Sequence, residues 1–236
     1  LRNNAGSRSL EEGRFRAAVD ELDEAIRLAE RTGHAMGLAV ATNNRGEATF
    51  ALGRLDEAAA DFAAALATCQ RIGSRMAAYP LLRSADLHRL RGDLDQARAA
   101  YEDALTHARA AADRQGSVPA LAGLARIVAD EEPDRADALI AEAQACDRGI
   151  AEVEVTLAAG WIALCRGDAG AAAGWARQAL TAAGARAQGP RLAEAIELAA
   201  LAGPAVERVA RFTEAAGLWA EMGHEPGAAV NAYLLA

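Results

Sequence analysis

Residues 43–66 read NNRGEATFALGRLDEAAADFAAAL, and the pattern of this stretch recurs along the chain. Its first four residues, at 43–46, match NNAG at 3–6, an offset of 40 residues. Its central GRL, at 53–55, matches GDL at 92–94. Self-similarity at a fixed spacing of this size is typical of proteins built from stacked repeats.

The second half of the stretch has the spacing of one helical face. Ala58, Phe62 and Ala65 are separated by four and three residues, which places them on one side of an α-helix. The small alanines let a neighbouring helix approach, and the larger residue between them fills the remaining space. Comparable sets recur elsewhere in the chain: Ala18, Leu22, Ala25 and Ile26; Ala97, Tyr101, Ala104 and Leu105; Ala136, Ile140 and Ala143; Ala172, Ala176 and Ala179.

A glycine before each of these faces predicts a turn between two helices. Gly53, Gly92 and Gly167 stand where the first helix of a pair would end, and glycine tolerates the left-handed conformation found there. Such a pair cannot bury its apolar face alone, so neighbouring pairs must stack. We therefore predict an all-α fold, an α-solenoid of about six helix pairs and about thirteen helices. The expected helices span residues 1–12, 14–32, 35–52, 55–72, 75–91, 93–113, 117–130, 133–146, 149–166, 168–184, 189–202, 204–222 and 226–236.

The pattern resembles the tetratricopeptide repeat (TPR), in which a small residue, a turn glycine, and then alanine, an aromatic and alanine follow one another. The residues that carry the resemblance are Gly46, Gly53, Ala58, Phe62 and Ala65. The resemblance covers nearly the whole chain and implies a right-handed solenoid. It is weaker near Pro133, where EEP at 131–133 replaces the turn glycine, and at Arg208, where alanine is expected.

The repeats are longer than the usual ones of about 34 residues. Long repeats with ends such as LAERTG, at 28–33, are similar to the TPR arrays of large bacterial LuxR-type or antibiotic-regulatory (STAND) transcriptional activators. In that family the array is a sensor arm between an ATPase module and a DNA-binding domain. We expect one TPR-like solenoid domain over residues 1–236. Because the chain starts at Leu1 and ends in a helical pattern, we expect a fragment of a longer protein.

Composition argues against two classes of protein. No apolar run approaches the ~18–20 residues that cross a bilayer, so we expect no membrane association. The formal net charge is −8 and the arginines are interleaved with acidic residues, so we expect no direct binding of nucleic acid by this domain. Cys69, Cys146 and Cys165 lack the spacing of zinc or redox motifs, which favours reduced thiols and a cytoplasmic location.

The chain lacks the motifs that would indicate an enzyme. The glycines at 167–170 are not followed by the Lys-Ser or Lys-Thr of a phosphate-binding loop. His34, His88, His107 and His224 are far apart in sequence, and no nucleophile elbow is present. We therefore expect no catalytic activity, no metal site and no cofactor.

In the resembled fold, the first helix of each pair lines a concave groove that binds ligands. Carrying this register over predicts binding residues of mixed chemistry, as a peptide groove requires: Asn3, Asn43, Glu47, Phe50, Tyr79, Leu82, Asp86, Arg89, Trp161 and Leu164. Two of them have an alternative. Trp161 could instead pack against a neighbouring helix, and the amide of Asn43, which can bind an extended peptide backbone, could instead serve helix packing.

We predict a non-catalytic protein-binding or ligand-binding TPR domain that acts as the sensor or interaction module of a bacterial multidomain transcriptional regulator. The alternative is a free-standing TPR adaptor or scaffold that assembles a protein complex. The expected partner is a protein or peptide, or a small-molecule effector. A homodimer through the end helices is a further option. The clamp that chaperone-binding TPR domains use for a terminal carboxylate is not expected, because Asp86 stands where a cation is needed.

Overall fold

The computed structural model describes residues 2–146, 149, 151–185, 189–224, 227 and 231. Over these residues the regular structure is entirely helical, with twelve α-helices and one short 3-10 helix. The chain divides into two compact units, residues 1–116 and 117–236. The predicted all-α fold of helix pairs is confirmed, and the assignment of residues 1–236 to a single domain stays a prediction.

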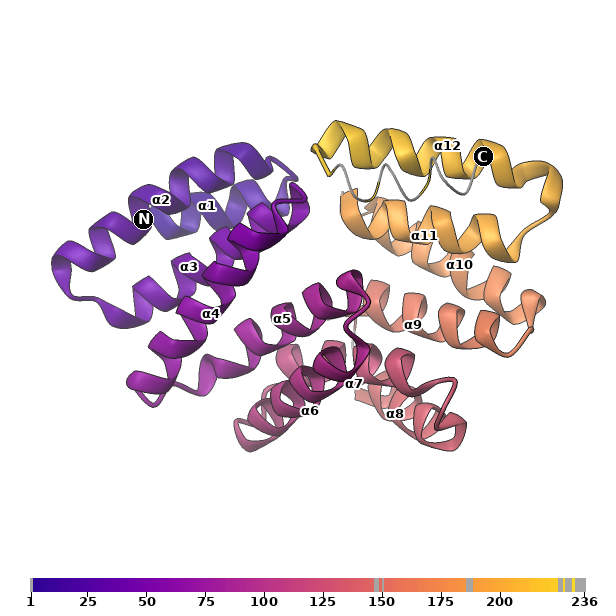
Figure 1. The fold of residues 1–236 in the computed structure, drawn as a ribbon, viewed down its shortest axis with the longest axis horizontal. Helices are drawn as coiled ribbons and strands as arrows, with labels where there is room; N and C mark the ends of the chain where they lie inside the picture. The colour runs from indigo at the N-terminus through magenta and orange to yellow at the C-terminus, as the bar shows by residue number, and fades with distance from the viewer. Residues whose placement is uncertain are drawn as a thin grey trace. The chain divides into compact units, whose positions relative to one another are not determined.

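The helices of the first unit follow one another in antiparallel pairs (Figure 1). They are α1 (Arg2–Glu11), α2 (Phe15–Thr32), α3 (Ala35–Ala51), α4 (Leu55–Arg71), η1 (Arg75–Ala77), α5 (Ala78–Arg91) and α6 (Leu94–Ala110). Helix α7 (Arg114–Val128) begins in this unit and ends in the second one. In the second unit lie α8 (Pro133–Cys146), α9 (Glu152–Cys165), α10 (Ala169–Ala185), α11 (Gly189–Ala202) and α12 (Ala205–Met222). Of the thirteenth predicted helix, 226–236, only Gly227 and Asn231 belong to the described residues.

Close approach between the two helices of a pair depends on a residue without a side chain. A Cβ atom added at Gly46 of α3 would lie 2.5 Å from Cε1 of Phe62 in α4, and one added at Gly6 of α1 would lie 2.5 Å from Cγ of Leu22 in α2. Phe62 is 1% exposed. These two pairs therefore each close over one large side chain, as the spacing of the repeat predicts.

The first helices of successive pairs also contact one another within the first unit. Helix α3 packs against both α1 and α5, and the second helix of each pair packs against the first helix of the next. Arg45 of α3 adds a polar link, because its guanidinium donates to Asp23 of α2 at 2.6 Å and to Asp61 of α4 at 2.9 Å. The result is a layer of α1, α3 and α5 supported from behind by α2 and α4.

The joints between pairs have a left-handed backbone, and one of them has no glycine. Gly33 and Gly73 have φ of 65° and 61°, and the equivalent residue after α6 is Ala112, with φ of 52°. An alanine in this conformation is strained by the clash of its Cβ atom with the backbone. Asp113 compensates, since its Oδ1 accepts the N–H of Gln115 at 3.0 Å and caps the next helix.

This cap explains the difference between the predicted and observed start of α7. The sequence predicts a helix from residue 117, with Pro119 in its first turn. The helix instead starts at Arg114, directly after the cap, and Pro119 lies inside it. A second difference is η1, a 3-10 turn that takes the place of the first turn of the helix predicted from residue 75.

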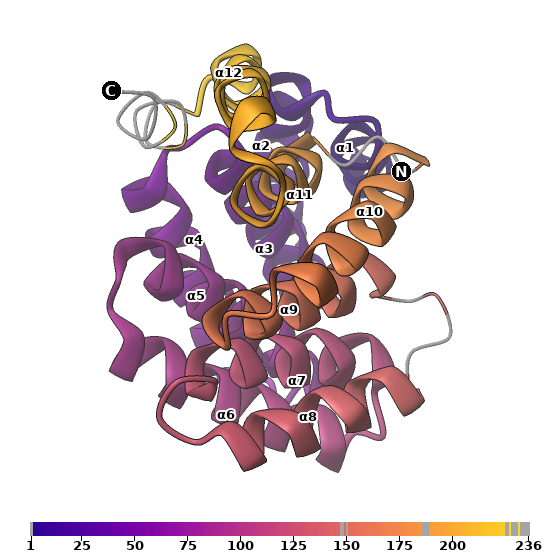
Figure 2. The same cartoon turned by 90° about the vertical axis from the view of Figure 1, so that its right-hand side faces the viewer.

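The second unit has its own apolar core, built from α9, α10 and α11 (Figure 2). Val153 and Leu157 of α9 pack with Leu198 of α11 and with the alanines of α10. A Cβ atom added at Gly160 of α9 would lie 2.4 Å from Cδ2 of Leu198, so close contact through glycine recurs here. Within the described part of the chain, no helix is both long and apolar enough to span a bilayer.

The close contact between α3 and α4 generates a stability prediction. Replacing Gly46 by alanine should lower the free energy of unfolding by about 1–3 kcal/mol, because the added methyl group overlaps the ring of Phe62. Gly217→Ala in α12 is the control: no atom lies within 4 Å of its added Cβ, so the substitution should raise stability by up to about 1 kcal/mol. Urea unfolding followed by circular dichroism measures both, and equal effects would contradict the contact.

Candidate functional site

A groove of about 480 Å³ lies in the first unit and is open to solvent on one side. Its floor comes from α3, where the positions 39, 40, 43, 44 and 47 repeat at helical spacing and so share one face. Helices α1 and α5 form its two sides, and the end of α4, η1 and the start of α7 complete it. The lining residues are Ser7, Leu10, Glu11, Ala39, Val40, Asn43, Asn44, Glu47, Cys69, Met76, Tyr79, Pro80, Arg83 and Gln115.

Part of the groove is apolar. Ala39, Cys69 and Met76 belong to one packed cluster in which Cys69 is 2% exposed, and burial raises the pKa of its thiol. Val40 and Pro80 extend this wall along α3 and α5. The volume falls within the range of small-ligand sites, and the lining combines apolar and polar groups.

Asn43 is the polar group at the centre of the α3 face. It is 7% exposed, and its Nδ2 donates to Oε1 of Glu47 at 3.1 Å. Its Oδ1 is buried and accepts no hydrogen bond within the part of the chain that the structure describes. A buried acceptor without a donor lowers the free energy of unfolding. A donor that reached this oxygen would therefore stabilise the folded chain.

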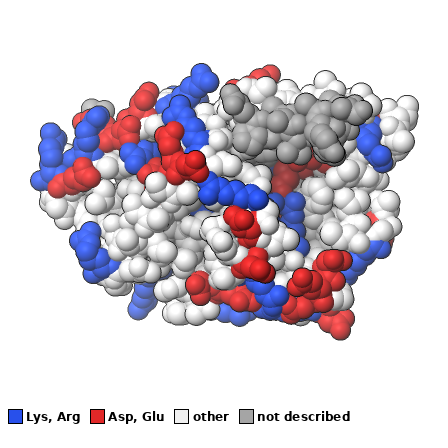
Figure 3. Space-filling view, viewed as in Figure 1, with Lys and Arg blue, Asp and Glu red and all other residues white. Residues whose placement is uncertain are grey.

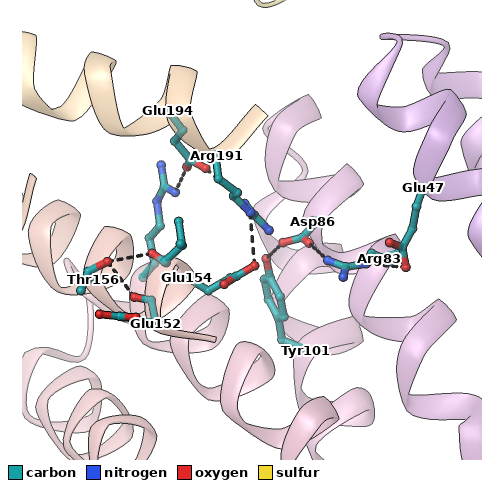
Figure 4. Close-up of polar contacts among 11 residues, drawn as sticks. Glu47, Arg83, Asp86, Tyr101, Glu152, Glu154, Thr156, Arg191 and Glu194 are labelled. Carbon is teal, nitrogen blue, oxygen red and sulfur yellow. Dashed lines mark hydrogen bonds and ion pairs between the residues drawn. The ribbon is translucent and has the colours of Figure 1, made fainter. Parts of the chain in front are cut away.

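A chain of polar contacts fixes the position of Glu47 (Figure 4). Nε of Arg83 lies 3.1 Å from Oε1 of Glu47, and Nη1 of Arg83 donates to Asp86 at 3.2 Å. On the other side, the hydroxyl of Tyr101 donates to Asp86 at 2.7 Å. Tyr101 is fully buried, which raises the pKa of its phenol. The carboxylate that orients Asn43 is therefore anchored to the interior of the first unit through α5 and α6.

Tyr79 stands on the α5 side of the groove. Its hydroxyl is 3.5 Å from Oε1 of Gln115. Burial, together with the nearby Asp113 carboxylate, raises the pKa of Tyr79 to about 12. The phenol is therefore a neutral hydrogen-bonding group at physiological pH.

The structure brings three of the predicted binding residues together, since Asn43, Glu47 and Tyr79 all line the groove. Other candidates from the same unit lie beside it. Phe50 packs against Phe62 and its neighbours, and Leu82 is 2% exposed. Asp86 and Arg89 both interact with Tyr101. The side chain of Asn3 is outside the described residues, and binding by any of these residues stays a prediction.

Trp161 and Leu164 lie on α9 in the second unit, partly buried against its core. The guanidinium of Arg126 stacks over the Trp161 ring at 4.5 Å from the centroid, a cation–π contact. Arg126 also pairs with Glu194. Nε1 of Trp161 is buried and has no hydrogen-bond partner among the described residues. The packing alternative for Trp161 therefore has direct structural support, and its role in binding is untested.

Sequence reasoning did not select several residues that line the groove. Val40, Asn44 and Arg83 could have been found, because they share a helical face with the residues that were selected. Cys69 and Met76 could not, since they enter from the end of α4 and from η1, and their position depends on how successive pairs stack.

The described residues include no metal cluster, and the face drawn in Figure 3 has mixed charges. No group of three or more His, Cys, Asp and Glu among them could hold a metal ion. On the face drawn in Figure 3, acidic and basic side chains are interspersed. Such a pattern lacks the continuous basic stripe that phosphate backbones require.

Comparisons with known proteins agree with this geometry. Residues 37–110, which include most of α3 and all of α4, α5 and α6, match the tetratricopeptide repeat family. The match therefore covers two of the helix pairs of the first unit, and α1 and α7 lie outside it. No curated protein matches the chain in sequence.

Two solved structures share the fold at low sequence identity. One is BtubC (BKLC) from P. vanneervenii, with a TM-score of 0.57, 17% identity, and coverage of 88% of this chain and 92% of that one. The other is a Rap protein in complex with Competence and Sporulation Factor, with a TM-score of 0.65, 13% identity, and coverage of 98% and 71%. At these identities the likeness concerns the fold alone.

The unpaired oxygen of Asn43 generates a second prediction. Asn43→Leu keeps the volume and removes both the unpaired acceptor and the 3.1 Å bond to Glu47, whose carboxylate keeps Arg83 as a partner, so the two effects should largely cancel and leave the free energy of unfolding within about 1 kcal/mol of the wild-type value. The matched control is Asn44→Leu, which loses the 3.0 Å bond from Asn44 Nδ2 to Ser7 and should lower stability by about 1 kcal/mol. Urea unfolding compares the two variants. A loss of stability in Asn43→Leu as large as in Asn44→Leu would show that the Asn43 oxygen is satisfied.

Proposed function

We propose that the chain is a non-catalytic interaction module that binds a peptide or protein segment in the groove of the first unit. The observation that carries this proposal is Asn43, a residue of the groove lining whose buried Oδ1 has no donor among the described residues. The N–H groups of a peptide main chain are the donors that such an oxygen would accept. A functional site is also where a protein is expected to retain an unsatisfied group that lowers its stability.

Other features of the chain support a polypeptide ligand. The TPR match covers most of α3 and all of α5, which form the floor and one side of the groove, and repeats of this type are interaction modules. One protein with a similar fold, the Rap protein, was solved in complex with Competence and Sporulation Factor. The groove combines an apolar wall with separate polar groups, as a site for alternate side chains and main chain requires.

For the larger role, we propose a sensor arm of a cytoplasmic, bacterial multidomain transcriptional regulator. Each helix pair in a repeat array contacts mainly its neighbours, so the array deforms easily. A guest that contacts α1, α3 and α5 at once would favour one curvature of the first unit. The attached domains would then respond to the change in that curvature. A small-molecule effector would act by the same route.

The second candidate role, a free-standing adaptor or scaffold, is favoured by a separate surface. Val206 and Val209 of α12 are 87% and 62% exposed and lie three residues apart, on one side of the helix. Exposed apolar side chains of this kind suit a protein partner, or a second copy in a homodimer through the end helices.

The binding proposal can be tested on an array of random-sequence peptides. We expect the wild-type chain to bind a subset of them and Asn43→Leu to lose that subset, because leucine cannot accept the main-chain hydrogen bond. Loss of one such bond should weaken binding by about tenfold. Gly217→Ala, which lies in α12 and does not line the groove, is the control and should retain the whole subset. If no peptide depends on Asn43, the groove is not the binding site.

The sensor arm and the adaptor differ in the conformational change that we expect when a ligand binds. A sensor arm should change its radius of gyration when an Asn43-dependent peptide saturates it, whereas a rigid adaptor should not. Small-angle X-ray scattering on the same chain with and without peptide measures this. In the adaptor case, Val206→Asp and Val209→Asp should instead abolish association with a partner or a second copy, as measured by analytical ultracentrifugation.

A further inference from the structure

We propose that the groove of the first unit selects a peptide segment that carries a basic side chain next to an apolar one. This inference rests on the proposed function and specifies its ligand class. It is derived from three properties of the groove: the orientation of the Asn43 amide, the balance of charges along the lining, and the position of the apolar wall.

The Asn43 amide has an acceptor without a partner. One N–H of its Nδ2 donates to Glu47, and the anchoring of Glu47 by Arg83 holds that contact in place. Its Oδ1 is buried and has no donor among the described residues. A guest that supplies an N–H group, as a peptide main chain or a basic side chain does, would satisfy this oxygen.

The charged groups of the lining have an excess of carboxylates. They are Glu11, Glu47 and Arg83. Arg83 is shared between Glu47 and Asp86, so its positive charge is opposed from both sides. Glu11 is exposed at the end of α1 and forms no ion pair with any described residue. A positively charged guest is attracted to this lining, and an acidic one is repelled.

The apolar wall lies close to these acceptors. Leu10 precedes Glu11 on α1, and Val40 lies one helical turn from Asn44 and three residues from Asn43 on α3. Met76 and Pro80 face the same groove from η1 and α5. A volume of about 480 Å³ falls within the range of small ligand sites and suits a few residues of a peptide, one of them apolar.

The peptide array tests this ligand class directly. Among peptides whose signal falls in Asn43→Leu, we expect arginine and lysine to be enriched over aspartate and glutamate, with an aliphatic or methionine residue within two positions. For a basic peptide from this subset, Glu11→Gln should weaken binding by about twofold to fivefold and reduce its salt dependence. Glu11→Lys should shift the array preference toward acidic peptides.

The matched control is Glu12→Gln. Glu12 is the next residue, is exposed and pairs with Arg14, but it does not line the groove. It should leave affinity and salt dependence unchanged. Circular dichroism checks that each variant keeps its helix content.

The outcomes separate this inference from the proposed function. If Asn43-dependent peptides exist but are acidic or uncharged, or if Glu11→Gln and Glu12→Gln behave alike, the ligand class is wrong and the groove remains a binding site. If no peptide depends on Asn43, both proposals are overturned.

Discussion

Contact between helices at a residue without a side chain is the constraint on which the first two helix pairs of the first unit depend. Gly46 lets α3 approach the ring of Phe62 closely, and Gly6 does the same for α1 over Leu22. The second helix of each pair covers one face of the first helix. The opposite faces of α1, α3 and α5 therefore contribute to the groove. The polar residues on those faces can then serve a guest, since the core is completed without them.

The groove itself is held by polar contacts that reach into the interior. Tyr101 is buried in α6, yet through Asp86 and Arg83 it determines where the Glu47 carboxylate lies. Burying a polar network of this kind costs desolvation free energy, and in return the network holds its side chains in one arrangement. Here the fixed geometry is that of the Asn43 amide, whose Nδ2 is held to Glu47 and whose buried Oδ1 has no donor among the described residues. Preorganisation of this kind lowers the entropic cost of binding.

The fold could be predicted from the sequence because it depends on short-range periodicity. The spacing of Ala58, Phe62 and Ala65 predicts one helix face. Gly53 and Gly92 predict turns between helices, and their φ angles are 71° and 81° in the structure. The start of α7 was missed because the Asp113 cap outweighed the tendency of Pro119 to begin a helix. The site was found only in part. Helical register placed Asn43, Glu47 and Tyr79 in the groove, whereas Cys69 and Met76 arrive there through the stacking of separate pairs.

The open side of the groove has a consequence for the kind of guest that can enter. A closed tunnel must be threaded from a chain terminus, and a terminal clamp recognises only an end. A groove that is open to solvent has no such requirement, so an internal segment of a partner can enter it as well as a free tail. Such a guest needs only a short extended stretch at its surface, so one scaffold could engage very different molecules that share that stretch.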